Sequence, residues 1–505
     1  MTKMQNGKGL LDRRASGVLM HISSLPGKTG IGTFGREARS FVDFLKNTSQ
    51  TYWQILPVGP TGMGDSPYQS FSTFAGNPYF IDFELLEEDG LLSGDDWRNV
   101  DWGSDLSSVD YGLLYRERGR VFEKIQRRFG EREPADYKKF CAENSWWLDD
   151  YSLFMAVKDA HGGRPFCEWE DGIRRRVPEA MEDWGKRCAD RVSYHKILQY
   201  LFRRQWTDLK RYANGSGIRI IGDIPIYVAA DSSDVWSSPE QFMLDGDYNP
   251  VEVAGCPPDG FSADGQLWGN PVYNWADMEK DGYSWWKRRL AISLEIYDVL
   301  RIDHFRGFDS YYCIPFGSKD ARGGTWRNGP GASLFAEIRR EFGDLPIIAE
   351  DLGFLTDSVR NMLSEVGFPG MKVLQFAFDS RETNTGYQPH SYPRNSVVYT
   401  GTHDNDTILG WIGSVDEGDI RLAMRYLRSG REDLPKNMMA AAMASVSNTC
   451  VLTMQDLLGL GGGARMNRPS TLGGNWKWRA LPGQISGREE ELLRDMTELY
   501  ERSRK

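Results

Sequence analysis

The sequence has few cysteines and lacks two motifs that would define common classes of protein. Six cysteines are spread over 505 residues and none forms a CxxC pair, so we expect neither a zinc ribbon nor a dithiol redox motif. Scattered thiols of this kind suit a reducing compartment. No GxxxxGK[ST] stretch is present, which argues against a phosphate-binding P-loop.

Long apolar runs and excess basic charge are also missing. No run of about eighteen uncharged apolar residues occurs, so we expect no membrane span and no membrane partner. Residues 1–15 lack the apolar core of a secretory signal, and we expect a cytoplasmic location, with the plastid stroma as the alternative. The net charge of −10 predicts no nucleic-acid partner. Monomer and homodimer both remain open.

What the chain does contain is a repeated alternation of short apolar runs and helical stretches. Each apolar run ends in polar or charged residues, and amphipathic segments such as 336–343 and 357–367 lie between them. Continuous apolar runs between helices are typical of parallel strands covered on both faces. Eight such units predict an α/β fold, a (β/α)₈ TIM barrel with large inserted, mainly helical subdomains. The runs are 17–27, 52–62, 218–228, 297–307, 345–353, 371–379, 396–406 and 450–459.

Two intervals are too long for simple connections between barrel units. We therefore expect the barrel to be formed by residues 1–62 and 217–485, with a mainly helical subdomain at 63–216 after the second strand. Its helical pattern at 114–129 places four apolar residues on one face, namely Val121, Phe122, Ile125 and Phe129. Residues 230–285 form a second insertion after the third strand, and 486–505 form a C-terminal helix that uses Leu492, Leu493, Met496 and Leu499.

Three acids follow three different predicted strands and should meet at the mouth of the barrel: Asp303, Glu350 and Asp404. Two carboxyl groups that flank one bond are the machinery of glycoside cleavage, and neighbouring strands can supply the spacing of the retaining type. Arg301 lies two residues before Asp303, on the same strand face, and we expect it to keep Asp303 ionised. Crowding by carboxylates should raise the pKa of Glu350, as a general acid requires.

Other interpretations of these residues remain open. A single acid at a strand end often caps the next turn or helix. His304 and His403 with Asp223 and Asp404 could form a metal site instead, but the closely spaced H-x-H pattern of metal-dependent barrel hydrolases is missing, so we expect no metal and no cofactor. His403 and Asp404 could also bind sugar hydroxyls. The residues alone leave a glycoside hydrolase and a glycosyl transferase equally open.

Eight segments in order along nearly the whole chain closely resemble the 4-α-glucanotransferase family. This family, also called amylomaltase or disproportionating enzyme, is related to the α-amylases. The matching segments are HISSLPGKTGIGTFG (21–35), SPYQSFSTFAGNP (66–78), GDIPIYVAADSSDVW (222–236), GCPPDGFSADGQLWGNPVYNW (255–275), RIDHFRGF (301–308), IAEDLG (348–353), GTHDND (401–406) and ARMNRPS (464–470).

The resemblance implies a role for each matching residue. Asp303 would be the nucleophile, Glu350 the acid and base, and Asp404 the residue that stabilises the transition state. The family has glycine after the proline of RMNxP, where this chain has Ser470. The residues that would bind the substrate are Tyr68, Asp223, Arg301 and His403 around the donor sugar, Gln266 and Trp268 in a covering loop, and Asn467 in a second covering loop.

The activity implied by the resemblance is transfer of α-1,4-glucan segments with retention of configuration. Donors would be maltooligosaccharides or starch or glycogen chains, acceptors would be glucose or another glucan, and cyclic glucans would form within one chain. An α-glucan hydrolase of the α-amylase type is the alternative, and a glucan-binding protein without activity is the non-enzyme alternative. Four tryptophans in the two loops could stack on sugars or anchor the loops: Trp268, Trp275, Trp476 and Trp478.

Overall fold

The computed structural model describes residues 9–62, 64–131, 133–258, 262–353, 355–381, 386–471 and 473–503. Within these ranges eight parallel strands close into a barrel in the order β1-β12-β11-β10-β9-β6-β3-β2. Each predicted run overlaps one barrel strand, so the predicted (β/α)₈ TIM barrel is confirmed. The strands are β1 Ala15–Leu19, β2 Tyr52–Gln54, β3 Arg219–Pro225, β6 Val299–Asp303, β9 Ile347–Ala349, β10 Gly370–Val373, β11 Ser396–Tyr399 and β12 Thr449–Thr453.

The barrel strands are short, apolar and buried on both faces. Every residue of β1 and of β12 is buried, as expected for parallel strands with helices outside and side chains inside. Gly17 in β1 is required by close packing, because a Cβ atom there would lie 2.5 Å from the carbonyl oxygen of Tyr52. The register between β3 and β6 pairs Asp223 with Arg301, which brings two predicted site residues side by side.

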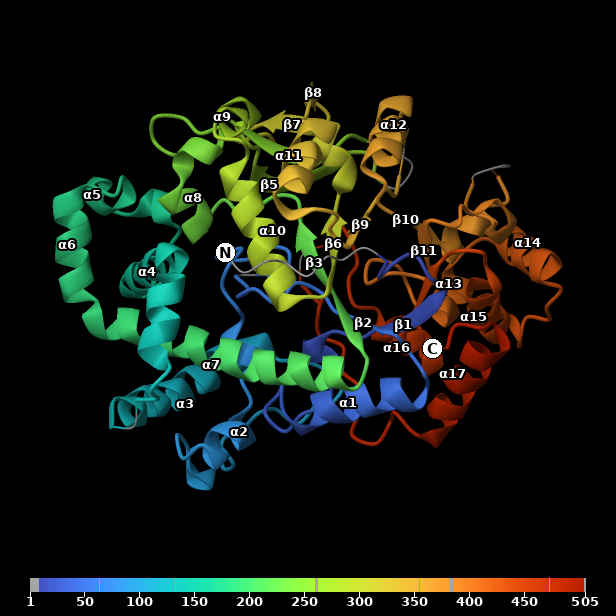
Figure 1. Ribbon diagram of the computed structural model, residues 1–505, viewed down its shortest axis with the longest axis horizontal. Helices are drawn as coiled ribbons and strands as arrows, with labels where there is room; N and C mark the ends of the chain where they lie inside the picture. Colours follow the sequence, from blue (N-terminus) through green and yellow to red (C-terminus); the bar gives the residue numbers. More distant parts are fainter. Residues whose placement is uncertain are drawn as a thin grey trace.

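Helices surround the barrel and extend it to one side (Figure 1). Helices α1, α11 and α12 each lie between two consecutive barrel strands in the chain, and α17 packs on α1 and α15. The helices are α1 Arg36–Asn47, α2 Phe83–Glu88, α3 Tyr111–Glu131, α4 Tyr137–Ala160, α5 Asp171–Arg174, α6 Pro178–Arg187, α7 Ala189–Gly215, α8 Ser233–Ser237, α9 Trp275–Lys280, α10 Ser284–Ile296, α11 Ala332–Phe342, α12 Asp357–Val366, α13 Ile408–Ser414, α14 Glu417–Leu427, α15 Leu434–Ala444, α16 Met454–Leu457 and α17 Gly487–Leu499.

The interval between β2 and β3 carries α2 to α7, which lie together at the left of Figure 1. The predicted apolar face of α3 is buried, with Val121, Phe122, Ile125 and Phe129 at most 3% exposed. That the interval forms a subdomain of its own stays a prediction. At the other end of the chain, α17 ends at Leu499, whose side chain is 66% exposed rather than packed as we expected. No helix in the described ranges is long and apolar enough to cross a membrane.

A second, antiparallel sheet was not predicted from the sequence. Its strand order is β5-β4-β7-β8, with β4 Glu252–Cys256 and β5 Gln266–Pro271 from the interval after β3, and β7 Ser310–Pro315 and β8 Thr325–Asn328 from the interval after β6. Figure 1 shows β5, β7 and β8 on the side of the molecule toward which the arrowhead of β3 points. The sheet therefore stands beside the mouth of the barrel, where the carboxyl ends of the strands meet.

Candidate active site

Asp303 and Glu350 leave the ends of two neighbouring barrel strands. Asp303 is the last residue of β6, and Glu350 directly follows β9. The register pairs Ile302 with Ala349, and the Glu350 N–H donates to the carbonyl of Ile302 at 3.1 Å. Because neighbouring strands lie about 4.8 Å apart, the two carboxyl groups emerge side by side.

The two carboxyl groups have different hydrogen-bond partners. Glu350 accepts from the backbone N–H groups of His304 (2.6 Å) and Leu352 (2.8 Å). His304 has a φ of 54°, a left-handed conformation in which its N–H faces Glu350. Asp303 instead accepts from the Arg301 guanidinium at 3.0 Å. A cation thus holds one carboxyl group and neutral backbone dipoles hold the other.

Both carboxyl groups have a pKa above the ordinary value. Loss of water around Glu350 raises its pKa, and the neighbouring Asp303 charge raises it further, as we predicted. For Asp303 we expected Arg301 to keep the carboxyl group ionised; desolvation raises the pKa of Asp303 to about 6, and Arg301 acts against this rise, so the carboxyl group is mostly ionised near neutral pH. Since Arg301 contacts Asp303 directly, Asp303 is the member of the pair that loses its proton first, and Glu350 keeps its proton to higher pH.

A buried chain of polar contacts holds Arg301 in place. Its guanidinium donates to Asp223 at 2.6 Å, and Asp223 also accepts from the Tyr68 hydroxyl at 3.0 Å. Arg301 is 3% exposed and Asp223 is fully buried. Although burial opposes it, the charges of Asp223 and Asp303 hold the pKa of Arg301 well above its usual value. Asp223 therefore stands behind Arg301, away from the open cavity.

Asp404 lies in the turn after β11 (Ser396–Tyr399) and forms a second polar group with His403 and Asn467. The His403 ring lies 3.3 Å from one Asp404 oxygen, and the Asn467 amide donates to the other at 2.6 Å. Desolvation acts to raise the pKa of Asp404, but His403 and Asn467 outweigh it and lower the pKa to about 2. Asp404 is thus an anion at every pH near neutrality. The Tyr68 ring stacks on His403 with centroids 5.1 Å apart, which joins this group to the first.

One cavity of about 800 Å³ brings nearly all the predicted site residues together. Besides the three acids it is lined by Leu352 and by residues of the two covering loops. Asp223 is the exception, since it lines a separate pocket of about 50 Å³ behind Tyr68. The predicted residues on the large cavity are Tyr68, Gln266, Trp268, Arg301, Asp303, Glu350, His403, Asp404 and Asn467.

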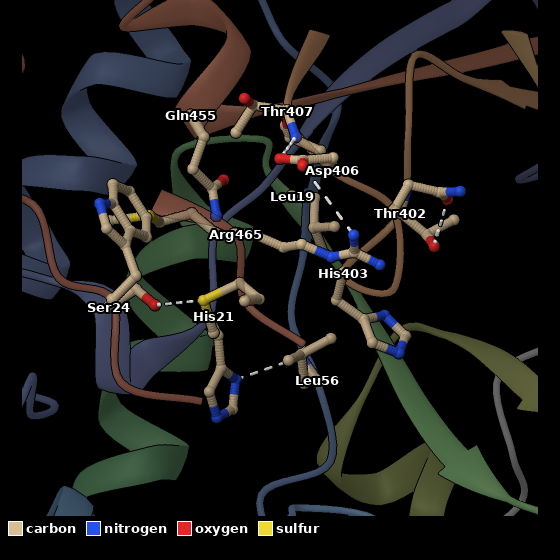
Figure 2. A pocket seen from close by; sticks show the side chains of 15 residues that line it. Leu19, His21, Ser24, Leu56, Thr402, His403, Asp406, Thr407, Gln455 and Arg465 are labelled. Atoms are coloured by element: carbon tan, nitrogen blue, oxygen red, sulfur yellow. Dashed lines mark hydrogen bonds and ion pairs between the residues drawn. The ribbon is translucent and has the colours of Figure 1, made fainter. Parts of the chain in front are cut away.

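A small pocket behind His403 is shown in Figure 2. Arg465 reaches toward Asp406 there, and on the other side it donates to the Asp404 carbonyl at 2.5 Å. His21 accepts from the Leu56 N–H at 3.2 Å, and burial lowers the pKa of His21 to about 3, so this ring is neutral. A neutral His21 adds no positive charge beside His403, and Arg465 ties the second covering loop to the Asp404 turn.

The tryptophans of the covering loops divide between the two interpretations that the sequence left open. Trp275 and Trp478 belong to the main hydrophobic core and anchor their segments. Trp268 is partly exposed and lines the cavity, where its indole N–H donates to Gln266 at 3.0 Å. Trp476 is buried and lines the cavity beside His403, with ring centroids 5.8 Å apart.

Among the cavity residues that were not predicted to bind substrate, His304 and Phe376 have aromatic rings close to the carboxyl pair or to its strands. His304 packs edge-on against Trp268 with centroids 4.8 Å apart, and its buried Nε2 atom lacks a hydrogen-bond partner in the described part of the chain. The position of His304 directly after Asp303 could have indicated that its side chain lies at the cavity. Phe376 follows β10 in a 3₁₀ turn and also lines the cavity. The apolar run around Phe376 gave no sign that one of its residues would leave the core.

Ser470, the position where the chain departs from the resemblance, has a left-handed backbone. Its φ is 62°, a conformation that glycine adopts without strain and that serine adopts at a cost. Ser470 lines the large cavity and belongs to the second covering loop. The backbone at Ser470 therefore has the left-handed conformation that glycine favours, although the residue is serine.

The histidines and acids do not gather into a metal centre in the part of the chain that the structure describes. No group of three or more His, Cys, Asp or Glu side chains in those residues is arranged to hold a metal ion. His304 contacts Trp268, whereas His403 contacts Asp404. His304, which the metal interpretation would have combined with His403 and Asp404, thus contacts a tryptophan ring instead.

A barrel with paired carboxyl groups on neighbouring strand ends is an architecture of glycoside-bond chemistry. The sequence profile of the 4-alpha-glucanotransferase family matches residues 20–483. A 4-alpha-glucanotransferase of Streptococcus pneumoniae is 51% identical, over 97% of this chain and 98% of the relative. The chain therefore belongs to the 4-alpha-glucanotransferase family.

Two further relatives agree with this assignment. The structure of an amylomaltase from Streptococcus agalactiae in complex with acarbose superimposes with a TM-score of 0.95, at 45% identity, over 97% of this chain and 100% of the other. A 4-alpha-glucanotransferase of Arabidopsis thaliana, named as chloroplastic or amyloplastic, is 40% identical over 97% of this chain and 86% of the relative.

Proposed function

We propose that this protein transfers α-1,4-glucan segments from a donor chain to the 4-OH of glucose or of another glucan. The observation that carries the proposal is the unequal pair at the barrel mouth, with Asp303 held by Arg301 and Glu350 held by two backbone N–H groups. Arg301 favours the anion of Asp303, and desolvation together with the Asp303 charge favours the protonated form of Glu350, so the pair provides an anionic nucleophile beside a protonated acid. Donors are maltooligosaccharides and starch or glycogen chains, and transfer within one chain gives cyclic glucans.

The reaction has two displacements. Asp303 attacks the anomeric carbon while Glu350 gives its proton to the leaving oxygen, so the donor's reducing-end fragment departs and a glycosyl ester forms on Asp303. Glu350, now a carboxylate, then takes the proton of the acceptor 4-OH as that oxygen attacks the anomeric carbon. The ester breaks, Asp303 and Glu350 regain their starting protonation states, and the new bond keeps the α configuration.

The surrounding residues act on the sugar and on the two carboxyl groups. Asp404, an anion held by Asn467, stabilises the positive charge that develops on the sugar ring and binds its hydroxyls together with His403. Tyr68 and Arg301 hold the donor sugar, and Asp223 orients both of them from behind. This set of groups supplies acid, base, nucleophile and charge stabilisation, so the proposed reaction uses no metal or cofactor.

Transfer requires that an acceptor sugar reach the glycosyl ester before water does. Gln266 and Trp268 from one covering loop and Asn467 from the other line the cavity over the carboxyl pair. Covering a site in this way excludes water and limits hydrolysis. We propose that these loops favour transfer. The cytoplasmic location stays a prediction, and the plant relative named as chloroplastic or amyloplastic keeps the plastid alternative open.

Chromatography of the products from maltotriose, with purified protein and no added metal, tests the proposal. Transfer yields glucose together with maltopentaose and longer chains. Glucose and maltose alone would show a hydrolase. Unchanged maltotriose after long incubation with folded protein would favour the glucan-binding protein without activity.

A further inference from the structure

The antiparallel sheet beside the barrel mouth has one face turned away from the main core. Ala254 of β4 and Cys313 of β7 pair across the sheet and belong to the main hydrophobic core. The residues that alternate with them form what we call the outer face. Its members are Val253 and Gly255 in β4, Val251 just before β4, Tyr312 and Ile314 in β7, Phe316 just after β7, Trp326 on β8 and Leu267 on β5.

The outer face carries an unusual amount of exposed apolar surface. Four of its side chains are 44 to 55% exposed, namely Leu267, Trp326, Val251 and Phe316. Between them, Tyr312 and Ile314 pack with Val253 and Ala321 in a small cluster separate from the main core. Exposed apolar side chains gathered on one face of a sheet are a feature of binding surfaces.

Trp326 is held in one orientation although it is 45% exposed. The Arg306 guanidinium lies over its ring at 4.3 Å from the centroid, and the Tyr312 ring meets it edge-on at 5.3 Å. Arg306 is only 9% exposed and follows Asp303 by three residues, so the support for Trp326 comes from the catalytic strand end. A supported aromatic ring with exposed surface is suited to stacking against a ligand that has an apolar face.

The outer face is continuous with the catalytic cavity. Leu267, which pairs with Gly255 on the outer face, lines that cavity. The loop from β7 to β8 does so too, through Lys319, Asp320 and Ala321. The Ala321 N–H donates to the Asp264 carbonyl at 3.0 Å, and Asp264 belongs to the first covering loop. A chain leaving the cavity past Leu267 therefore meets the outer face next.

We infer that the outer face binds the part of a long α-1,4-glucan that extends beyond the catalytic cavity, with Trp326 as the main stacking residue. The inference rests on the proposed function, because it takes its ligand from that reaction. Glucose rings present apolar C–H faces for stacking, and their hydroxyls can reach Lys319 and Asp320 at the cavity edge. By strand spacing, Trp326 on β8 lies roughly 14 Å from the β5 edge, so a glucan that passes Leu267 must extend across the sheet to reach it.

The test compares Trp326→Ala with wild type on amylose and on maltotriose. We expect the KM for amylose to rise about fivefold with kcat unchanged, and the kinetics with maltotriose to stay within about twofold. Tyr115→Ala is the matched control, since Tyr115 is 74% exposed on α3, away from the sheet in Figure 1, and should leave both substrates unaffected. Phe316→Ala, at another edge of the outer face, should raise the KM for amylose about twofold.

The outcomes separate this inference from the proposed function. An unchanged amylose KM in a folded Trp326→Ala protein overturns the inference, and so does an equal rise for both substrates, which would mean damage to the cavity. If Trp326→Ala does not fold, the Phe316→Ala result decides in the same way. Failure of the wild type to lengthen maltotriose would overturn the proposed function instead.

Discussion

The catalytic carboxyl groups and the residues that cover them are held by two different kinds of structure. Asp303 and Glu350 sit at the ends of β6 and β9, whose positions are set by hydrogen bonds to neighbouring barrel strands. Trp268 lies in β5 of the antiparallel sheet, a strand that we had expected to be a loop, and Asn467 lies in an irregular segment; their side chains bond to Gln266 and Asp404. We therefore propose that the strand ends carry out cleavage of the glycosidic bond and that the covering residues influence which acceptor receives the glucan.

Removing either catalytic carboxyl group should have the largest effect. Asp303→Ala lacks the nucleophile and Glu350→Gln lacks the acid, so we expect turnover of maltotriose to fall by about a thousandfold or more. Asp183→Asn on α6, an equal change of charge at an exposed side chain outside the cavity lining, is the control and should retain most activity. Glucan affinity, measured by calorimetry, should persist in both inactive variants. A variant that keeps a tenth of the activity would contradict its assigned role.

Arg301 should control the acid side of the pH profile. Asp303 must be ionised, so activity falls as pH drops through its raised pKa; Glu350 must be protonated, so activity falls as pH rises through its own. Arg301→Gln removes a charge that lowers the pKa of Asp303. The acid limb of kcat/KM should therefore move to higher pH, with kcat down by about a hundredfold. An unmoved acid limb would show that Arg301 acts only on the donor sugar.

Trp268 should affect the fate of the glycosyl ester more than its formation. Trp268→Ala opens the cover beside His304, so the ratio of hydrolysis to transfer should rise several-fold while total donor consumption changes little. Reducing-end release and chain-length distribution, followed together, give this ratio. Trp146→Ala on α4, 40% exposed and outside the cavity lining, should leave it unchanged. The same ratio in both variants would remove the covering role of Trp268.

Ser470 should give the smallest effect. Glycine adopts the left-handed conformation without backbone strain, but it also increases the conformational entropy of the unfolded chain. Because these two effects oppose each other, we expect Ser470→Gly to raise the free energy of unfolding by about 0.5 kcal/mol or less. Denaturant unfolding would measure the change. A clear loss of stability would mean that contacts of the serine side chain outweigh the backbone strain.

The barrel could be predicted because each of its strands is a continuous apolar run that ends in polar residues. The antiparallel sheet could not, because β4 pairs with β7 across a long stretch of sequence that includes β5 and β6, and no local pattern encodes that pairing. The outer-face residues Trp326 and Phe316 were missed for the same reason.

Within the candidate site, residue identity was easier to predict than electrostatics. Asp303, Glu350 and Asp404 follow predicted strands, and the structure brings all three to one cavity. The raised pKa of Asp303 depends on desolvation by the whole cavity, which the nearby Arg301 in the sequence does not reveal. The position of Asp223 behind Arg301 likewise depends on the register between β3 and β6.

Intact-protein mass spectrometry of Glu350→Gln with a maltosyl fluoride donor tests the central claim most directly. Fluoride leaves without an acid, so Asp303 can still form the glycosyl ester, whereas the missing base slows its transfer to an acceptor. The account predicts a mass increase of one maltosyl group that maps to the peptide containing Asp303. Rapid consumption of the donor with the protein mass unchanged, or an adduct on another residue, would contradict it.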